Sequence, residues 1–260
     1  MKKSVTLFAV LLLIAALYHP VRAQSNLSPV VAPQKILDSI MGLLIYKRDY
    51  LRFAEEFTAY DSNAKLITKE QFLKSLGTGA YVPVALSSGS EKKSYQLQKL
   101  PEGIDRDFRT IIRQWGETYY NQYSREGQGL PSMDFVDLNG KRYTFENTRG
   151  KILVIKCWFI NCLPCVQEMP RLNQVVEHFR KRKDILFVSL AIDPQDKLKD
   201  FLKKTKFSYA VVPDKENYMQ KELKIGSYPT HLIVNKQGKI FKMVSRAEEL
   251  VVALNEVAKK

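Results

Sequence analysis

Two cysteines separated by two residues are the part of this sequence best suited to chemistry. Cys162-Leu163-Pro164-Cys165 follows the apolar stretch Ile152 to Trp158, which predicts a strand, and opens an amphipathic stretch that predicts a helix. The first turn of a helix has unpaired N–H groups and the positive end of the helix dipole, and both lower the pKa of a thiol placed there. Cys162 is therefore expected to form a reactive thiolate.

The second cysteine completes a redox pair. Cys165 lies one turn further along the predicted helix, where it can attack a mixed disulfide formed at Cys162 and release the partner. Pro164 falls in the first helical turn, where its missing N–H costs little, and it stiffens the loop between the two sulfurs. The pattern indicates thiol–disulfide exchange, with a purely structural disulfide as the alternative.

The sequence gives less support to a metal site at these cysteines or to binding of nucleic acid. A zinc site would need about four ligands, whereas the chain has three cysteines, three histidines, no second Cys pair and no His close to Cys162. The formal net charge is +14, but neither a glycine-rich phosphate loop nor an arginine–aromatic pattern accompanies it. We predict no metal, no cofactor and no nucleic-acid partner.

Residues 1–23 have the layout of a secretory signal peptide. Two lysines precede the apolar run Leu7 to Leu17, which is shorter than the roughly 17–25 residues of a spanning helix. Ala23 is the small residue at which cleavage before Gln24 is expected. The sequence thus predicts an exported protein, soluble in the periplasm or cell envelope. An uncleaved membrane anchor is the alternative, because the residues before Ala23 are not ideal for cleavage.

The remaining chain is long enough for two small domains. Residues 24–128 are expected to form an accessory region that is mostly helical with one hairpin. The predicted elements are helices over Pro33 to Tyr60, Thr68 to Leu76 and Ile104 to Ser124, with hairpin strands Ala80 to Leu86 and Ser94 to Leu100. Thr68 and Gln71 form a capping-box pattern at the start of the second helix.

Residues 129–260 alternate short apolar strands with helices, which predicts an α/β domain. Asn139-Gly140 marks a hairpin between Phe135 to Leu138 and Arg142 to Phe145. The later strands are predicted at Ile152 to Trp158, Ile185 to Ile192, Tyr209 to Val212, His231 to Asn235 and Ile240 to Val244, and the helices at Cys162 to Lys181, Asp196 to Lys204, Asn217 to Leu223 and Arg246 to Ala258.

The segment Val154 to Pro170 resembles the active-site segment of the TlpA/ResA-like disulfide reductases, exported bacterial proteins with a thioredoxin domain of the redoxin (AhpC/TSA) type. Matching features occur at Leu130 to Gly140, Gly150-Lys151 and Ser227-Tyr228-Pro229-Thr230. Together they span residues 129–260, about half of the chain. The resemblance implies a thioredoxin-like fold with a central mixed sheet flanked by helices, and thiol–disulfide exchange.

Carried over by position, the resemblance gives roles to particular residues. Cys162 becomes the exposed nucleophile and Cys165 the resolving thiol, so that this pair forms the redox disulfide. Pro229 becomes a cis-proline facing them, and Tyr228 presents backbone groups to the substrate chain. Pro164 is also expected to contact substrate. Glu168 matches an active-site glutamate that accepts the proton of Cys165 or raises thiol pKa values; the alternative is a solvated helix carboxylate.

Four nearby residues remain to be interpreted. Asn161 replaces the tryptophan often found before the first cysteine, which is expected to change substrate preference. Lys156 either favours the thiolate or extends to solvent at the sheet edge. Cys157 is expected to be a buried free thiol on the opposite face of the strand. His231 is expected to be a strand residue at the sheet end, with a proton-shuttle role as the alternative.

The sequence therefore predicts an exported thiol–disulfide oxidoreductase, in its favoured form a disulfide reductase. Its partners would be protein thiols and disulfides, and the resemblance implies a membrane electron donor for re-reduction. The direction of exchange stays open, because an oxidative role needs no such donor. Two rival functions also stay open: a peroxide-reducing redoxin, for which Phe159 and Asn161 are poorly suited, and a partner-binding protein with an incidental redox site.

Overall fold

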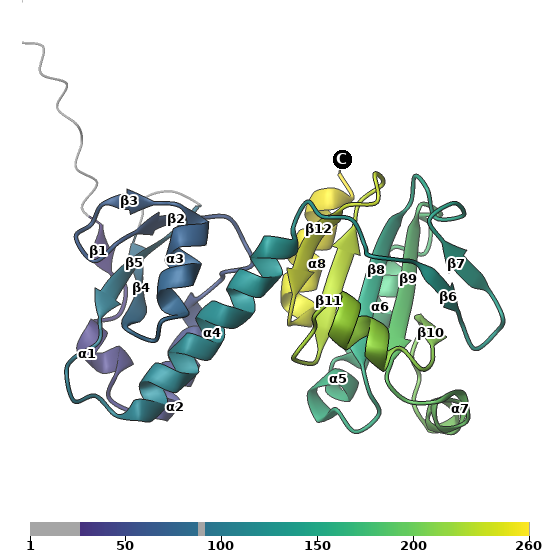
Figure 1. The fold of residues 1–260 in the computed structure, drawn as a ribbon, viewed down its shortest axis with the longest axis horizontal. Helices are drawn as coiled ribbons and strands as arrows, with labels where there is room; N and C mark the ends of the chain where they lie inside the picture. The colour runs from purple at the N-terminus through teal and green to yellow at the C-terminus, as the bar shows by residue number, and fades with distance from the viewer. Residues whose placement is uncertain (1–26, 88–91, 260) are drawn as a thin grey trace, which may run out of the picture.

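The computed structural model describes residues 27–87 and 92–259, so the predicted signal peptide lies outside the described residues. Two sheets, each with its own helices, are joined by the long helix α4 (Arg106–Arg125), which Figure 1 shows crossing from one to the other. In the part of the chain that the structure describes, no helix combines the length and the apolar character needed to cross a bilayer.

The N-terminal sheet has five strands in the order β1-β4-β5-β2-β3. Its strands are β1 (Ser28–Pro29), β2 (Phe57–Tyr60), β3 (Leu66–Ile67), β4 (Tyr81–Ser87) and β5 (Lys93–Lys99), and its helices are α1 (Pro33–Ile36), α2 (Ile40–Tyr50) and α3 (Lys69–Leu76). The hairpin β4–β5 and the capping box of α3, in which Thr68 Oγ1 accepts from the Gln71 N–H, confirm two of the predictions.

The prediction of a single helix over residues 33–60 is wrong, because the structure has α1, α2 and β2 in this range. Ser39 caps α2, and the chain leaves the helix at Leu51, which is extended. Phe57 then begins β2, which pairs in parallel with β5 and alternates buried and half-buried residues. An alternating pattern of this kind suits a strand with one buried face, so the apolar residues after Leu51 reach the core by extended chain.

Helix α4 belongs to the core of the N-terminal sheet and also contacts the second sheet. Phe108, Ile112, Trp115 and Tyr119 of this helix, which confirms the one predicted over Ile104 to Ser124, are buried in the N-terminal core. Gly116 lies against α3, where a Cβ atom would come within 2.2 Å of the Gly77 nitrogen. Helix α4 therefore packs more closely on α3 than any larger residue at this position would allow.

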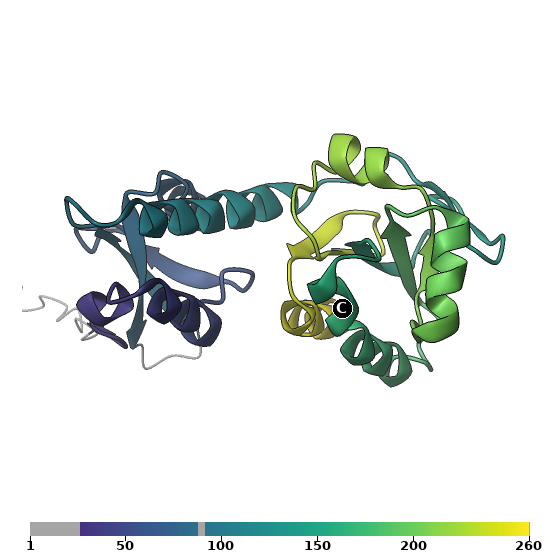
Figure 2. The ribbon, with the colours of Figure 1, turned by 90° about the horizontal axis from the view of Figure 1, so that it is seen from below.

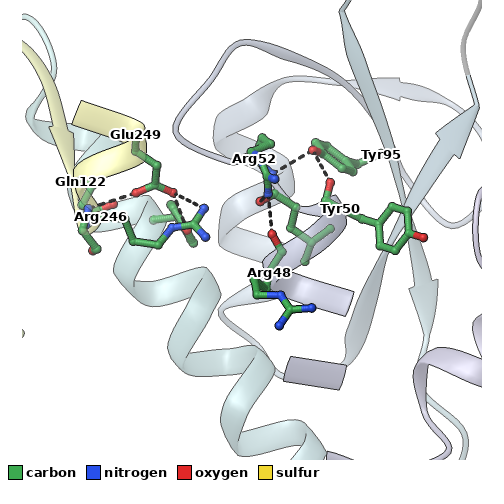
Figure 3. A network of polar contacts seen from close by, with 10 residues as sticks. Arg48, Tyr50, Arg52, Tyr95, Gln122, Arg246 and Glu249 are labelled. Carbon is green, nitrogen blue, oxygen red and sulfur yellow. Dashed lines mark hydrogen bonds and ion pairs between the residues drawn. The ribbon is translucent and has the colours of Figure 1, made fainter. Parts of the chain in front are cut away.

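Polar contacts join the end of α4 to the C-terminal sheet. Gln122 Nε2 donates to Ser245 Oγ at 2.6 Å, and the Tyr119 hydroxyl donates to Glu249 Oε1 at 3.1 Å. Figure 3 shows Gln122 of α4 beside Arg246 and Glu249 of the C-terminal unit, and Arg52 of the N-terminal unit opposite them. Figure 2 shows α4 lying along the N-terminal unit, with its C-terminal end at the second unit.

The chain after α4 adds to the edge of the second sheet. Edge strand β12 (Ile240–Val244) makes two backbone hydrogen bonds there: Ile240 O accepts from the Gly127 N–H at 2.8 Å, and the Ile240 N–H donates to Gln128 O at 2.7 Å. Gly129 forms a bridge to Lys239. Lys242, on β12, contacts Glu126 at 2.8 Å and Glu56 of the N-terminal unit at 3.2 Å.

The C-terminal sheet has the order β10-β9-β8-β11-β12. Strands β8 (Ile152–Trp158), β9 (Ile185–Ala191) and β10 (Ala210–Val212) are parallel, and β11 (Thr230–Val234) is antiparallel to both β8 and β12. A separate hairpin is formed by β6 (Asp134–Val136) and β7 (Arg142–Thr144). The helices are α5 (Leu163–Gln167), α6 (Met169–His178), α7 (Gln195–Lys204), α8 (Ala247–Val257) and the short π-helix η1 (Tyr218–Glu222).

The two faces of this sheet are covered differently. Residues of α6 and α8 share a core with Ile152 and Val154 on one face, whereas the hairpin and η1 share a core with Leu153 and Ile155 on the other. All residues of β8 are buried, as expected for the central strand of a covered sheet. A mixed sheet of this order, with helices on its faces and a preceding hairpin, is the predicted thioredoxin-like fold.

Candidate active site

The two cysteines of the motif form a disulfide at the start of α5, beyond the end of β8 (Figure 1). Cys162 is the N-cap residue of α5, and its Sγ accepts the Cys165 N–H at 3.3 Å. The loop before it is held by the Ile160 N–H, which donates to Asp193 Oδ2 at 2.8 Å. When the disulfide is reduced, the Cys165 N–H lies where it would stabilise a thiolate at Cys162.

Cys162 is less accessible than expected of an exposed nucleophile. It is 5% exposed and Cys165 is fully buried. Both belong to a buried apolar cluster that also contains Trp158 and Met169. Solvent reaches Leu163, which is 66% exposed, and the neighbouring Pro164, so these residues form the surface in front of the pair.

The loop before β11 lies beside the cysteine loop. Thr230 pairs with Cys157 in the sheet, which places Pro229 next to the end of β8. The Tyr228–Pro229 bond is cis, as predicted. The Tyr228 ring packs edge-on against Phe159, at 5.5 Å between centroids, and contacts the cluster that contains both cysteines. The structure thus brings the predicted substrate loop to the predicted redox pair.

Glu168 lies at the junction of α5 and α6, where the single helix expected over 162–181 is divided. Pro170 falls in the first turn of α6, where a missing N–H is tolerated but the preceding helix is interrupted. The Glu168 side chain is 13% exposed and points into the protein, where it forms an ion pair with Lys156. It is therefore not a solvated helix carboxylate.

Lys156 and His231 are both fully buried against this carboxylate. They face each other across β8 and β11, and His231 Nε2 lies 3.0 Å from Glu168 Oε1. Because β8 is central, Lys156 has no sheet edge to reach, so extension to solvent is ruled out. Within the described residues, neither ring nitrogen of His231 has a hydrogen-bond partner. Sequence reasoning did not place these two residues together.

Burial and pairing set the charges of this group. Burial alone would raise the pKa of Glu168, but contacts with His231 and Lys156 outweigh it and hold that pKa below its usual range. Burial lowers the pKa of His231 despite the nearby carboxylate, and burial likewise lowers the pKa of Lys156. At neutral pH the group therefore contains an ionised Glu168 and a neutral His231.

The third cysteine is separate from this chemistry. Cys157 is a free, fully buried thiol in the core on the opposite face of β8, as predicted. Burial raises its pKa far above the usual range, which makes it unreactive at neutral pH. Over residues 27–87 and 92–259, no cluster of three or more His, Cys, Asp or Glu side chains is arranged to hold a metal ion.

Comparison with known proteins gives matches over the C-terminal half. The AhpC/TSA family model matches residues 127–243. The thiol-disulfide oxidoreductase ResA of Bacillus cereus is 28% identical over 148 residues, covering 55% of this chain and 84% of that protein. ResA of Bacillus subtilis is 26% identical over 142 residues, covering 52% and 79%. A thioredoxin domain of a Bacteroides vulgatus thiol-disulfide oxidoreductase superposes at a TM-score of 0.46, with 21% identity, covering 50% and 96%.

A dithiol motif at a helix start on a thioredoxin-like sheet, together with these relatives, makes the protein a thiol–disulfide oxidoreductase. Within its C-terminal half, residues 127–243 match the AhpC/TSA family model. The family model begins at residue 127, so the N-terminal sheet and the whole of α4 lie outside the match.

Proposed function

We propose that this protein is an exported disulfide reductase that acts on protein disulfides of the cell envelope. The observation that carries the proposal is the Cys162–Cys165 disulfide at the start of α5, next to the loop that contains Pro229. A thiol with a helical N–H donor at its sulfur and a second thiol within bonding distance is the minimum required for exchange.

The proposed cycle transfers two electrons from the dithiol to the substrate. The Cys162 thiolate attacks one sulfur of the substrate disulfide, and the other substrate sulfur leaves as a thiolate that takes a proton. The Cys165 thiolate then attacks Cys162 Sγ, which expels the second substrate thiolate and forms the Cys162–Cys165 bond. The substrate ends as a dithiol and the enzyme as a disulfide.

Neighbouring residues support this cycle in distinct ways. Glu168, ionised and one turn beyond Cys165, is proposed to accept the Cys165 proton during the second attack. Tyr228 and Pro229 are proposed to bind the substrate backbone beside the attacked bond, and the exposed Pro164 to contact it from the other side. Residues 129–260 would thus form the catalytic domain and residues 24–128 an accessory domain.

Export and re-reduction belong to the same proposal. The apolar run Leu7 to Leu17 supports a signal peptide cleaved before Gln24. In an oxidising envelope the disulfide must be reduced again after each cycle, so a membrane electron donor is the expected partner. Fractionation of the producing cell, with mass analysis of the purified protein, tests both points: a periplasmic protein that begins at Gln24 is expected, and an intact N-terminus in the membrane fraction would contradict it.

The reduction potential of the pair tests the direction. The protein from Gln24 onward is equilibrated with dithiothreitol or glutathione mixtures and analysed by mass, with Cys157→Ala as the matched control. A potential near that of thioredoxin, about −270 mV, is expected for a reductase, whereas one near −120 mV would make it an oxidant. Faster oxidation of the dithiol by hydrogen peroxide than by a protein disulfide would instead support the peroxide-reducing alternative.

A further inference from the structure

The buried group beneath the disulfide contains two basic residues that the cycle above does not use. We propose that Lys156 and His231 are positioning residues for the resolving step. In this proposal Lys156 holds the Glu168 carboxylate in place, and His231 shares the proton that Glu168 takes from Cys165. The proposal rests on the proposed exchange cycle and deepens it: the proton acceptor is the Glu168–His231 pair rather than a lone carboxylate.

The geometry favours a shared proton. His231 Nε2 and Glu168 Oε1 are 3.0 Å apart. Nε2 makes no hydrogen bond to any residue that the structure describes, but at this separation a proton on either atom can form one once the ring and the carboxyl group are aligned. Two bare lone pairs facing each other at this distance would repel. In each favourable state one proton therefore lies between these atoms, either on the imidazole or on the carboxyl group.

The location favours retention of that proton. Lys156 and His231 are fully buried, and only Glu168, at 13% exposure, reaches toward the surface. The strand register fixes the two basic side chains on the same face of the sheet, directly opposite each other. Within the described residues, neither ring nitrogen of His231 has a hydrogen-bond partner that would hold the ring in one tautomer, so both protonation patterns remain available.

Charge balance also favours the pair. The ion pair between Lys156 and Glu168 balances the carboxylate, and burial disfavours a charge on His231 before resolution. When Cys165 loses its proton to the group, the new positive charge offsets the new thiolate. Other groups act on it from neighbouring elements: the buried Tyr209 hydroxyl on the Glu168 side, Glu249 of α8 toward His231, and Cys157 behind Lys156.

The resolving step then balances as follows. The proton leaves Cys165 Sγ for the Glu168–His231 pair, and the sulfur electron pair forms the new bond to Cys162 Sγ. The bond between Cys162 and the substrate sulfur breaks, and the substrate leaves as a thiolate with both electrons of that bond. When the enzyme is next reduced, the stored proton returns to Cys165.

A stopped-flow experiment separates attack from resolution. Reduced protein from Gln24 onward is mixed with one equivalent of dithiobis(nitrobenzoate), which releases one coloured thiolate when Cys162 attacks and a second when Cys165 resolves. His231→Gln, which cannot take up a proton, is expected to leave the first phase unchanged and to slow the second by about tenfold or more near pH 7. The defect should diminish as pH rises and Cys165 ionises without help.

Matched variants make the result specific. His178→Gln, an exposed histidine on α6, should follow wild type in both phases. Lys156→Arg should retain the second phase better than Lys156→Met, because it keeps the positive charge. Glu168→Gln combined with His231→Gln should be no slower than the slower single variant if the two residues act as one acceptor.

Two outcomes would overturn the inference: a second phase in His231→Gln that matches wild type at every pH, or effects of Glu168→Gln and His231→Gln that simply multiply. Thermal unfolding of each variant shows whether a slow phase reflects loss of structure, in which case both phases slow together and the positioning role is rejected. Failure of the proposed function looks different, because wild type itself would then release no second thiolate.

Discussion

Lys156 and His231 occupy directly opposite positions on the antiparallel strands β8 and β11, and both contact the same oxygen of Glu168. Residues from three separate parts of the chain thus meet at one carboxyl group. The arrangement ties the stability of the domain to the ionisation of one carboxyl group, since an unpaired buried charge is costly.

Replacement of Lys156 by methionine tests this link. The lowered pKa of Glu168 means that its ionisation adds stability at neutral pH, and that this stability is lost as pH falls through the lowered pKa. Lys156→Met should cost about 3 kcal/mol at pH 7, and the deficit should shrink near pH 3. Urea unfolding of the oxidised protein measures it, with the exposed Lys183→Met as control. An equal deficit at both pH values would contradict the assignment.

Leu163 tests how substrates approach the pair. It is 66% exposed and lies next to Cys162, so a protein substrate should cover its side chain. Partial burial of a leucine is worth about 1 kcal/mol, so Leu163→Ser should raise the KM for insulin reduction about fivefold. The reaction with dithiobis(nitrobenzoate) should change less than twofold. Val252→Ser on α8, also an exposed apolar residue, should change neither; a parallel loss in both assays would reject substrate contact.

Lys242 tests the connection between the two sheets. Burial would lower its pKa, but Glu126 and Glu56 outweigh that effect and raise it. Its stabilising contribution is therefore fully present at neutral pH and is lost only as pH rises through the raised pKa. Lys242→Met should cost about 2 kcal/mol at pH 7 and progressively less as pH rises through the raised pKa of Lys242. Urea unfolding is the measurement, and the exposed Lys239→Met should unfold like wild type.

Gly116 tests the packing of α4 on α3. A methyl group there would lie 2.2 Å from the Gly77 nitrogen and 2.5 Å from the Leu76 carbonyl carbon, so the helices must separate. Gly116→Ala should destabilise the protein by about 3 kcal/mol or more. Gly129→Ala, whose nearest contact would be 3.9 Å away, is the matched control. A stability within 1 kcal/mol of wild type, measured by urea unfolding, would show that this contact is not tight.

Local patterns were sufficient for much of the fold. The apolar run at Ile152 to Trp158, the Asn139-Gly140 turn and the capping box at Thr68 each depend on residues close in sequence, and each was correctly predicted. Phe57 to Tyr60 was assigned to a helix instead, because its apolar residues continued a helical spacing. Its strand character comes from pairing with β5, more than thirty residues away.

For the site, as for the fold, the features that depend on residues close in sequence were predictable. The cysteine motif and the proline loop could be found because each is a short pattern. The meeting of Lys156 and His231 could not, since it depends on the register between β8 and β11, which no local pattern encodes. The signal that was available was a basic residue inside an apolar strand, together with a histidine directly after the loop proline. The low accessibility of Cys162 likewise depends on the packing around Trp158 and Met169.

The hydrogen bonds from residues 127–129 to β12 have a practical consequence for anyone who wishes to study the catalytic half alone. A protein trimmed to begin near Leu130 would leave the N–H and C=O groups at the start of β12 unpaired, and a bare strand edge is a template for intermolecular pairing. Such a fragment is expected to self-associate in a concentration-dependent way, even with an intact redox centre. A fragment that begins at α4 would keep residues 127–129 and therefore their pairing with the edge of β12.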